Sequence, residues 1–358
     1  MNKEKNESSA IMRGMITRGV GGLYGVRVPC DDSAAGEELL ARARGVFRLE
    51  KLTPTVGDTV TLRRSADGED CFIPGEACDG KNHCRQKKNG QINVDYVIES
   101  IEERKNILIR PPLSNLDYLF AVIPCASPEP DLLTADKLTS IAENCGIETV
   151  VIVNKSDLSP TRADEIAQIY RTAGYTVFTL SSETGDGIDA LEGFIRSIVR
   201  EGRESGKNVI GAFAGASGAG KSTLMTRLFP TLELKTGAVS RKTERGRHTT
   251  RHVELYPAET DAGILWIADT PGFSMLDFTR FDFFPYDDLA LSFREFGDCL
   301  GKCRYTKCTH LCEEGCAVIE KMRSGLISGS RHESYKRIFE EQRSVPEWKR
   351  RQEQKERL

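Results

Sequence analysis

The chain carries Gly215-Ala216-Ser217-Gly218-Ala219-Gly220-Lys221-Ser222 between an apolar run, Val209–Ala214, and a helical pattern that continues from Thr223 to Leu228. Glycines let the backbone wrap around a polyphosphate with its N–H groups pointing inward, and the start of a helix adds positive potential. This order of strand, glycine-rich loop and helix is the context that a phosphate-binding loop requires. We expect Lys221 to reach the β- and γ-phosphates as a catalytic residue, and Ser222 to bind Mg²⁺. The alternative is a glycine-rich loop that binds no ligand.

A second nucleotide signal, Asn154-Lys155-Ser156-Asp157, lies upstream at the end of the apolar run Thr149–Val153. Asp157 can accept hydrogen bonds from the ring N–H and the amino group of guanine. Adenine has no such pair of donors and would leave a buried carboxylate unpaired. Lys155 can lay its alkyl stem over the base plane. The loop Ser181–Gly185, at the end of the next predicted strand, can place a backbone N–H on the guanine O6. The sequence therefore predicts a site for GTP and GDP.

A third signal, Asp269-Thr270-Pro271-Gly272, ends the strand pattern Gly263–Ala268. Asp269 is expected to hold Mg²⁺ through water, and the Gly272 N–H to contact the γ-phosphate. The polar segment Gly246–Arg251 lies between the phosphate loop and this strand. Thr249 or Thr250 in that segment is expected to be the second protein ligand of Mg²⁺, and we assign the role to Thr250. The residues expected to bind the nucleotide are Asn154, Lys155, Asp157, Ser181, Ser182, Gly215, Ala216, Ser217, Gly218, Ala219, Gly220, Lys221, Ser222, Thr223, Thr249, Thr250, Asp269 and Gly272.

The three signals occur in an unusual order. Ras-like GTPases have the phosphate loop first, then Asp-x-x-Gly, then Asn-Lys-x-Asp, whereas Asn154–Asp157 comes first here. A circular permutation of this kind keeps the site and moves the chain ends. Phe273 stands where Ras-like enzymes carry the glutamine that orients the attacking water. A phenyl ring cannot orient water, so we expect His248 to be the catalytic residue that does so; the alternative is a plain surface histidine.

The cysteines point to a metal site. Five of the 11 cysteines fall between Cys299 and Cys316, a crowding that suggests metal binding in a reducing compartment. Three thiolates and one imidazole suit a tetrahedral, structural Zn²⁺. Cys299 and Cys312 could replace one of the four ligands. A second set, Cys71, Cys78, His83 and Cys84, is better explained as unpaired loop thiols than as a second zinc site. The expected ligands of the single zinc are Cys303, Cys308, His310 and Cys316.

The composition is that of a soluble globular protein, with 39% hydrophobic and 29% charged residues among 358 and a net charge of −3. The first ten residues are polar and contain no apolar segment of a signal peptide. No apolar run approaches the roughly 18 residues that a membrane span needs. We therefore expect a cytoplasmic monomer that binds neither membrane nor DNA. Two stretches, Arg241–His248 and Lys321–Leu358, are locally basic, and a solvated helix face with a charged tail is the simpler interpretation of the second.

The predicted elements divide the chain into a β-rich part, an α/β part and a cysteine-rich helical part. Short strand-like runs, Gly45–Leu49 among them, indicate a small barrel or sandwich. Strands that alternate with helices indicate a doubly wound α/β sheet. The expected segments are a disordered N-terminus over 1–13, the barrel over 14–112, the α/β domain over 113–280, a zinc-binding helical domain over 281–343, and a basic tail over 344–358.

Taken together, these motifs resemble those of the RsgA (YjeQ/YloQ) family, circularly permuted GTPases that act in small ribosomal subunit biogenesis. The resemblance implies an N-terminal OB-fold that binds RNA, a central Ras-like P-loop GTPase domain and a C-terminal zinc domain. It implies binding to the 30S subunit and its 16S rRNA, late maturation of that subunit, and slow hydrolysis stimulated by the ribosome. The family's zinc ligands map onto Cys303, Cys308, His310 and Cys316, and its proposed catalytic histidine onto His248. The resemblance rests on Arg110-Pro111-Pro112, Asn115-Leu116-Asp117, Asn154–Asp157, Gly215–Thr223, Gly246–Thr250, Asp269–Phe273 and Cys303–Val318.

Two other functions compete with a ribosome-stimulated GTPase. A non-catalytic RNA-binding assembly factor would use the nucleotide as a structural ligand; Phe273 favours it slightly, and the intact Lys221, Ser222 and Asp269 oppose it. A P-loop kinase for a small molecule would need an acceptor pocket, and Asn154–Asp157 speaks against it. For the GTPase, the permuted order suggests that loss of the γ-phosphate relaxes the segment after Asp269 and shifts the zinc domain.

Overall fold

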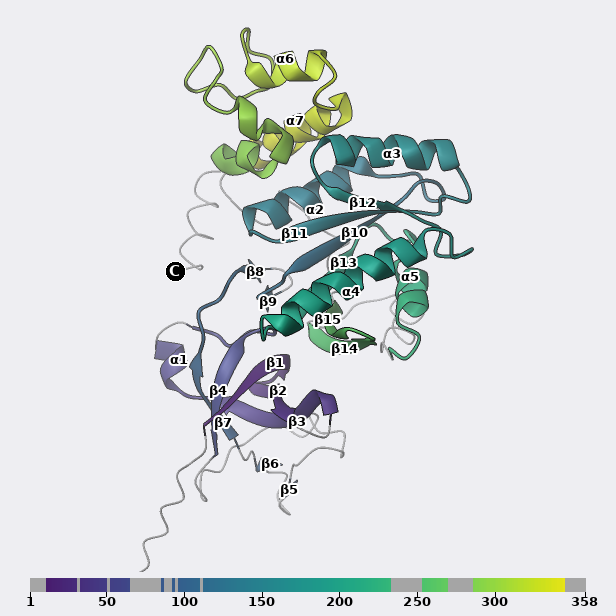
Figure 1. Ribbon diagram of the computed structural model, residues 1–358. Coiled ribbons are helices and arrows are strands. Elements are labelled where there is room, and N and C mark those ends of the chain that lie inside the picture. The colour runs from purple at the N-terminus through teal and green to yellow at the C-terminus, as the bar shows by residue number, and fades with distance from the viewer. Residues whose placement is uncertain are drawn as a thin grey trace, which may run out of the picture. The chain divides into compact units, whose positions relative to one another are not determined.

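The computed structural model describes residues 11–30, 33–49, 52–64, 85–86, 92–93, 96–109, 112–232, 253–269 and 286–344. The chain divides into two compact units (Figure 1). The first unit comprises residues 1–108, 112–115 and 234–257, and the second comprises 109–111, 116–233 and 258–358. Among the helices in the described ranges, none combines the length and apolar character needed to cross a membrane.

Five strands of the first unit close into a small barrel. Their order is β1-β2-β3-β7-β4, and β4 pairs in turn with β1. The β3–β7 pair is parallel, and the other pairs are antiparallel. The barrel interior is filled by buried apolar side chains such as Ile16, Val26, Val60 and Ile98. A closed five-stranded barrel is the OB-fold arrangement that the resemblance implied. The strands are β1 (Met12–Val20), β2 (Leu23–Cys30), β3 (Ser33–Ala43), β4 (Thr59–Arg64) and β7 (Tyr96–Ile101).

The strand-like run Gly45–Leu49 was wrongly interpreted. It contains a short helix, α1 (Val46–Leu49), in which Phe47 is buried and Val46 is exposed. The Phe47 carbonyl accepts a hydrogen bond from the Leu52 N–H at 2.9 Å, which closes a turn rather than a ladder. So short an apolar run fits a strand or one helical turn equally well, and only the packing of Phe47 decides between them.

A parallel sheet forms the centre of the second unit. The strand order is β12-β11-β10-β13-β15, and each neighbouring pair is parallel. This confirms the predicted α/β sheet. In such a sheet the carboxyl ends of the strands meet at one edge, where ligands bind. The strands are β10 (Tyr118–Pro124), β11 (Glu148–Asn154), β12 (Thr176–Thr179), β13 (Val209–Ala214) and β15 (Gly263–Asp269). The remaining strands are β5 (Arg85–Gln86), which pairs with β6 (Ile92–Asn93), β8 (Ile107–Ile109), which pairs with β9 (Pro112–Ser114), and β14 (Glu254–Thr260).

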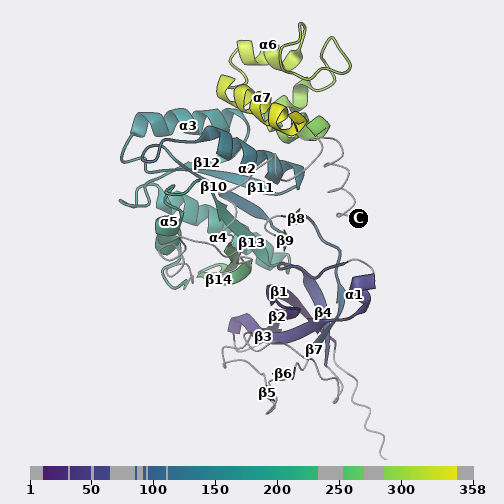
Figure 2. The same cartoon turned by 180° about the vertical axis from the view of Figure 1, so that it is seen from behind.

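Helices cover both faces of the parallel sheet. Figures 1 and 2 show α2 and α3 on one face and α4 on the other. The helix α2 begins where the Asp131 carboxylate accepts a hydrogen bond from the Thr134 N–H, an N-cap, and α3 begins with Pro160 in its first turn. The helices are α2 (Leu132–Asn144), α3 (Pro160–Thr172), α4 (Ile188–Glu204) and α5 (Lys221–Leu228).

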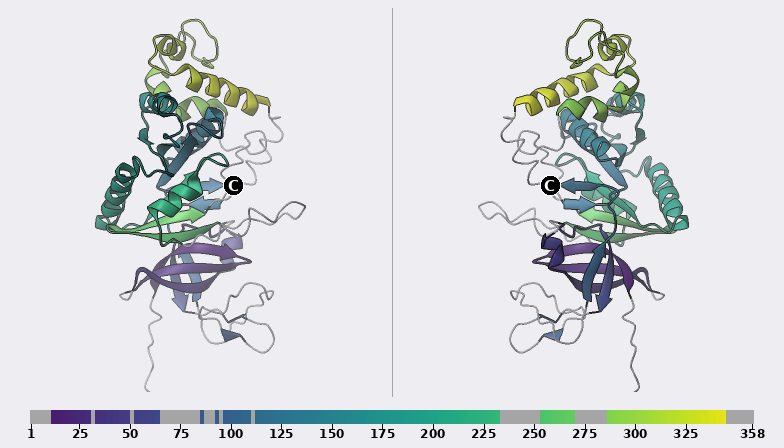
Figure 3. Two further views of the ribbon diagram at one scale, coloured as in Figure 1. Left: turned by 90° about the vertical axis from the view of Figure 1, so that its right-hand side faces the viewer. Right: turned by 90° about the vertical axis from the view of Figure 1, so that its left-hand side faces the viewer.

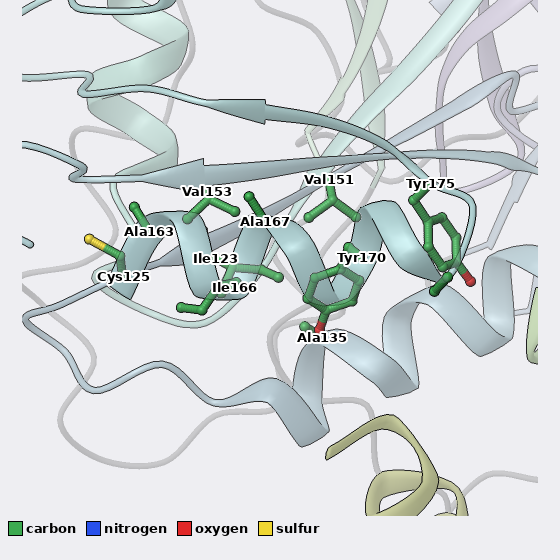
Figure 4. Close-up of a cluster of buried hydrophobic side chains, with 11 residues drawn as sticks. Ile123, Cys125, Ala135, Val151, Val153, Ala163, Ile166, Ala167, Tyr170 and Tyr175 are labelled. Carbon is green, nitrogen blue, oxygen red and sulfur yellow. The ribbon is translucent and has the colours of Figure 1, made fainter. Parts of the chain in front are cut away.

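Side chains from α2, α3, β10 and β11 form a cluster of buried, mostly hydrophobic residues (Figure 4). Tyr170 of α3 lies in this cluster, fully buried, and its hydroxyl donates to the Asp136 carboxylate of α2 at 2.8 Å. A phenol buried in this way needs a polar partner, so the cluster fixes α2 against α3. The members drawn are Ile123, Cys125, Ala135, Val151, Val153, Ala163, Ile166, Ala167, Tyr170, Ala173 and Tyr175.

The cysteine-rich part follows in the same unit. It contains two 3-10 helices, η2 (Tyr286–Ser292) and η3 (Arg294–Cys299), and two α-helices, α6 (Ala317–Arg323) and α7 (Gly329–Ser344). Figure 3 shows α7, in yellow, lying against α2. An ion pair at 2.6 Å joins Lys137 of α2 to Glu341 of α7. The cysteine-rich part is therefore packed on α2, the helix that follows β10.

Candidate nucleotide site and metal centre

The glycine-rich loop after β13 needs glycine for two close approaches. Gly215 has φ 144°, and a Cβ there would lie 2.2 Å from the Val122 carbonyl oxygen of β10. Gly220 has φ 90°, and its Cβ would lie 2.3 Å from the Asn154 side-chain amide. Any larger residue would force the loop away from the carboxyl ends of two neighbouring strands. The loop then passes directly into α5, whose first residue is Lys221.

Lys221 folds back over this loop. Its ammonium donates hydrogen bonds to the carbonyls of Gly215 at 2.8 Å and Ala216 at 2.9 Å. Burial lowers the pKa of Lys221 from its ordinary value. A partly buried cation whose contacts among the described residues are two neutral carbonyls is suited to an anionic ligand, because a phosphate would offset its lost hydration. Ser222, the expected Mg²⁺ ligand, is exposed at the start of α5.

Asn154 joins the two nucleotide signals that lie far apart in the sequence. Its side chain is fully buried and donates to the Ala219 carbonyl at 2.9 Å and to the Ser182 hydroxyl at 3.1 Å. Its oxygen accepts from the N–H groups of Lys155 at 2.8 Å and Ser182 at 2.9 Å. One amide therefore fixes the phosphate loop, the Asn-Lys-x-Asp loop and the Ser181–Gly185 loop to one another. Asp157 lies exposed on this edge of the sheet.

Two contacts that the sequence did not reveal hold the Asn154–Asp157 loop in place. The Cys125 thiol, buried at the end of β10, donates to the Lys155 carbonyl at 3.0 Å. The Lys155 ammonium donates to the Ser127 carbonyl. Lys155 itself has φ 66°, a left-handed conformation that these contacts and Asn154 support. No pattern in the sequence pairs Cys125 with Lys155, because the contact forms only when β10 and β11 lie side by side.

Several expected site residues cannot be placed. His248, Thr249, Thr250 and Gly272 lie outside the described residues, and so does the set Cys71, Cys78, His83 and Cys84. Asp269 ends β15, a neighbour of β13 in the sheet, and nothing is described of its side chain. The roles assigned to these residues remain predictions from the sequence.

The zinc prediction is matched by a compact group of four side chains. The ligand atoms of Cys303, Cys308, His310 and Cys316 all lie within 4.8 Å of one another, whereas Cys299 and Cys312 are not members of the group. Cys303 Sγ lies 3.9 Å from Cys316 Sγ and 3.5 Å from His310 Nδ1, and His310 Nδ1 lies 3.4 Å from Cys316 Sγ. Tetrahedral Zn²⁺ with ordinary bond lengths would place its ligands about 3.8 Å (S to S) and about 3.5 Å (S to N) apart. The donor set therefore fits one zinc.

The zinc loop is braced by residues behind the ligands. His332 Nε2 lies 2.7 Å from the His310 carbonyl, and the Tyr335 hydroxyl donates to the Thr309 carbonyl at 2.8 Å. The Glu313 carboxylate accepts from the N–H and hydroxyl of Thr309 and from the N–H groups of Leu311 and Cys312. These contacts fix the backbone on both sides of His310, as outer-shell partners of a metal site do.

Glu313 stays charged over the useful pH range. Burial opposes its ionisation, but the hydrogen bonds from Thr309 and from neighbouring backbone N–H groups outweigh burial and lower the pKa of Glu313 from 4.5 to about 2. Because the folded-state pKa is depressed, its stabilising contribution is present above pH 4.5 and is lost as the pH falls towards 2. The brace therefore does not vary between neutral pH and pH 5.

Replacing Glu313 with alanine is expected to weaken zinc binding by about 10–100-fold, the usual cost of losing an outer-shell partner. The reason is that four loop donors lose their shared acceptor while all four ligands remain. Competition with a chromogenic chelator measures the affinity. Glu314→Ala removes a neighbouring carboxylate that is 87% exposed, and should leave zinc affinity unchanged. Equal affinities for wild type and Glu313→Ala would contradict the brace.

Comparison with known proteins gives a consistent result. The family model described as "RsgA GTPase" matches residues 101–279, and that described as "RsgA N-terminal domain" matches residues 13–72. Proteins named "Small ribosomal subunit biogenesis GTPase RsgA" from Ruminiclostridium cellulolyticum and Alkaliphilus metalliredigens are 32% and 35% identical to this chain. The alignments cover 94% and 92% of this chain, and 95% and 97% of the relatives.

Two solved structures resemble the fold along most of its length. The crystal structure of YjeQ from Thermotoga maritima has a TM-score of 0.67 at 28% identity, covering 94% of this chain and all of the other. The structure titled as that of YloQ, a circularly permuted GTPase, has a TM-score of 0.65 at 27% identity, covering 94% of this chain and 97% of the other.

Proposed function

This chain belongs to the RsgA family of GTPases, and we propose that it hydrolyses GTP on the small ribosomal subunit and assists the late maturation of that subunit. The single observation that best supports a GTP site is the set of hydrogen bonds made by the Asn154 side chain. They join the phosphate loop to the Asn154–Asp157 loop and the Ser181–Gly185 loop, the two loops expected to contact the base. These hydrogen bonds support the idea that Asp157 and Lys221 serve opposite ends of one nucleotide, although they stand in reversed order along the chain.

The chemistry we assign is in-line attack by water on the γ-phosphate. Lys221 and the N–H groups of the loop Gly215–Gly220 would stabilise the charge that develops on the phosphate oxygens. Ser222 and Thr250 would hold Mg²⁺, with Asp269 bound through water, and the ion would neutralise phosphate charge. Asp157 would select guanine by accepting from its ring N–H and amino group.

We also assign 16S rRNA as a partner, and one loop of the zinc-bearing part supports this. Lys302, Arg304, Tyr305 and Lys307 are all exposed on the loop that carries the first two zinc ligands. Tyr305 is 49% exposed, and the Arg304 guanidinium lies 5.7 Å from its ring centre. The segment 302–307 contains no carboxylate. Cations beside an exposed aromatic ring suit phosphates and an unpaired base.

We further propose that the protein is cytoplasmic and works as a monomer.

Turnover of GTP and of ATP, each with and without purified small subunits, tests the proposal. We expect slow GTP hydrolysis by the protein alone, faster hydrolysis with subunits, and no comparable turnover of ATP. Binding to subunits without any phosphate release would favour the non-catalytic assembly factor. Equal use of ATP would revive the kinase alternative, because the loops Asn154–Asp157 and Ser181–Gly185 would then not select guanine over adenine.

A further inference from the structure

Arg227 connects α5 with the Ser181–Gly185 loop. Its Nε donates to the Ser182 carbonyl at 3.0 Å, and its Nη2 donates to the Glu183 carbonyl at 2.7 Å. Gly185, with φ 97°, lies against the guanidinium, since a Cβ there would be 2.7 Å from Arg227 Nη1. Arg227 of α5, the helix that starts with Lys221, thus donates hydrogen bonds to two successive carbonyls of the loop that is expected to contact the base.

The hydrogen bond from Arg227 to the Ser182 carbonyl sets the orientation of the Ser182–Glu183 peptide group. The Ser182 carbonyl and the Glu183 N–H belong to the same planar trans peptide and therefore point in opposite directions. With the carbonyl held by Arg227, the Glu183 N–H must point away from α5.

That N–H is the available donor of the loop. The Ser182 N–H is taken by Asn154, the Ser181 N–H by the Asp186 carbonyl, and the Thr184 and Gly185 N–H groups by Ser181. Among the residues that the structure describes, the Glu183 N–H has no hydrogen-bond partner. A charged donor on the carbonyl side of this peptide also polarises it and strengthens its N–H as a donor.

We propose that Arg227 is a positioning residue for guanine recognition: it fixes the Ser182–Glu183 peptide so that the Glu183 N–H is donated to the 6-oxo group of the base. The inference rests on the guanine-nucleotide site of the proposed function. The sequence marks Asp157 and the Ser181–Gly185 loop as contacts of the base, but no motif in it marks Arg227 as the residue that orients this loop.

The test compares three nucleotides on the full chain. GDP and IDP share the 6-oxo group and differ at the 2-amino group, whereas 6-thio-GDP keeps the guanine donors and carries sulfur, a weak acceptor, at position 6. Arg227→Met is expected to weaken GDP and IDP by about tenfold each, the loss of one well-placed hydrogen bond. The affinity for 6-thio-GDP should change by less than about twofold, because that bond is already weak there. Calorimetric titration measures all three affinities.

Two further variants separate positioning from charge. Arg227→Lys keeps the positive charge but lacks the planar fork that holds two carbonyls, so it should resemble Arg227→Met. Arg171→Met removes an exposed arginine from α3 and should change no affinity. Equal weakening of all three nucleotides, wild-type behaviour of Arg227→Lys, or no effect of Arg227→Met would each overturn the proposal. A wild-type protein that binds ADP as well as GDP would instead refute the proposed function.

Discussion

Replacing His248 with alanine is expected to remove most of the turnover that small ribosomal subunits stimulate, while GTP binding stays intact. Phe273 occupies the position of the water-orienting glutamine of Ras-like enzymes, so another side chain must position the attacking water. A histidine that positions or deprotonates water contributes about 10²–10⁴-fold to a rate. The loss should therefore fall in that range for the stimulated rate and be small for the slow rate of the protein alone.

Single-turnover phosphate release with saturating GTP and small subunits measures this effect. His252→Ala is the matched control, because His252 lies four residues along the same segment and is assigned no role; it should keep the full stimulated rate. Retention of the stimulated rate by His248→Ala would show that another group orients the water. A loss of GTP affinity as large as the loss of rate would move His248 from the reaction to binding.

The parts of the fold and site that the sequence predicted are local patterns. The phosphate loop, the Asn-Lys-x-Asp loop and the cysteine spacing each place their chemistry within one short segment, so the residues can be found without knowing the fold. The parallel strands followed from apolar runs separated by helical patterns. By contrast, the strand predicted for Gly45–Leu49 was wrong, because five residues contain too little periodicity to distinguish a strand from a turn of helix.

What the sequence could not show are contacts between segments far apart. The hydrogen bonds from Cys125 to the Lys155 carbonyl and from Arg227 to the Ser182 carbonyl form only after the strands and helices have assembled. The charged stretch that starts at Lys321 was interpreted as a solvated helix face. Arg331 in that stretch is fully buried, and composition cannot reveal this because the carboxylates that compensate it are Asp136 and Glu295.

Arg331 of α7 lies in the contact between the zinc-bearing part and α2. Its guanidinium donates to Asp136 at 2.6 Å and to Thr139 at 3.1 Å, both on α2, and to Glu295 of η3 at 2.7 Å. It also stacks on Phe293, with 4.5 Å between the guanidinium carbon and the ring centre. A nucleotide-driven shift of the zinc-bearing part, as the permuted order suggests, would have to open this cluster and expose its charges, or else carry α2 along.

Arg331→Met is therefore expected to destabilise the protein by about 3–5 kcal/mol, because two carboxylates that are 1% and 3% exposed lose their shared cation. Urea unfolding followed by circular dichroism measures the loss. Arg337→Met on the exposed side of α7, where the arginine is 61% exposed beside Glu333, should cost less than about 1 kcal/mol.

Neutralising the two carboxylates tests the physical reason. Combining Arg331→Met with Asp136→Asn and Glu295→Gln should recover much of the stability, because no uncompensated charge then remains buried. If the single variant is as stable as wild type, the cluster is not the tie between α2 and α7 that its geometry indicates. If the triple variant is no more stable than the single one, the loss comes from packing of the arginine stem against Phe293 rather than from charge. In both cases the zinc-bearing part would be freer to move against α2 than the ion pairs imply.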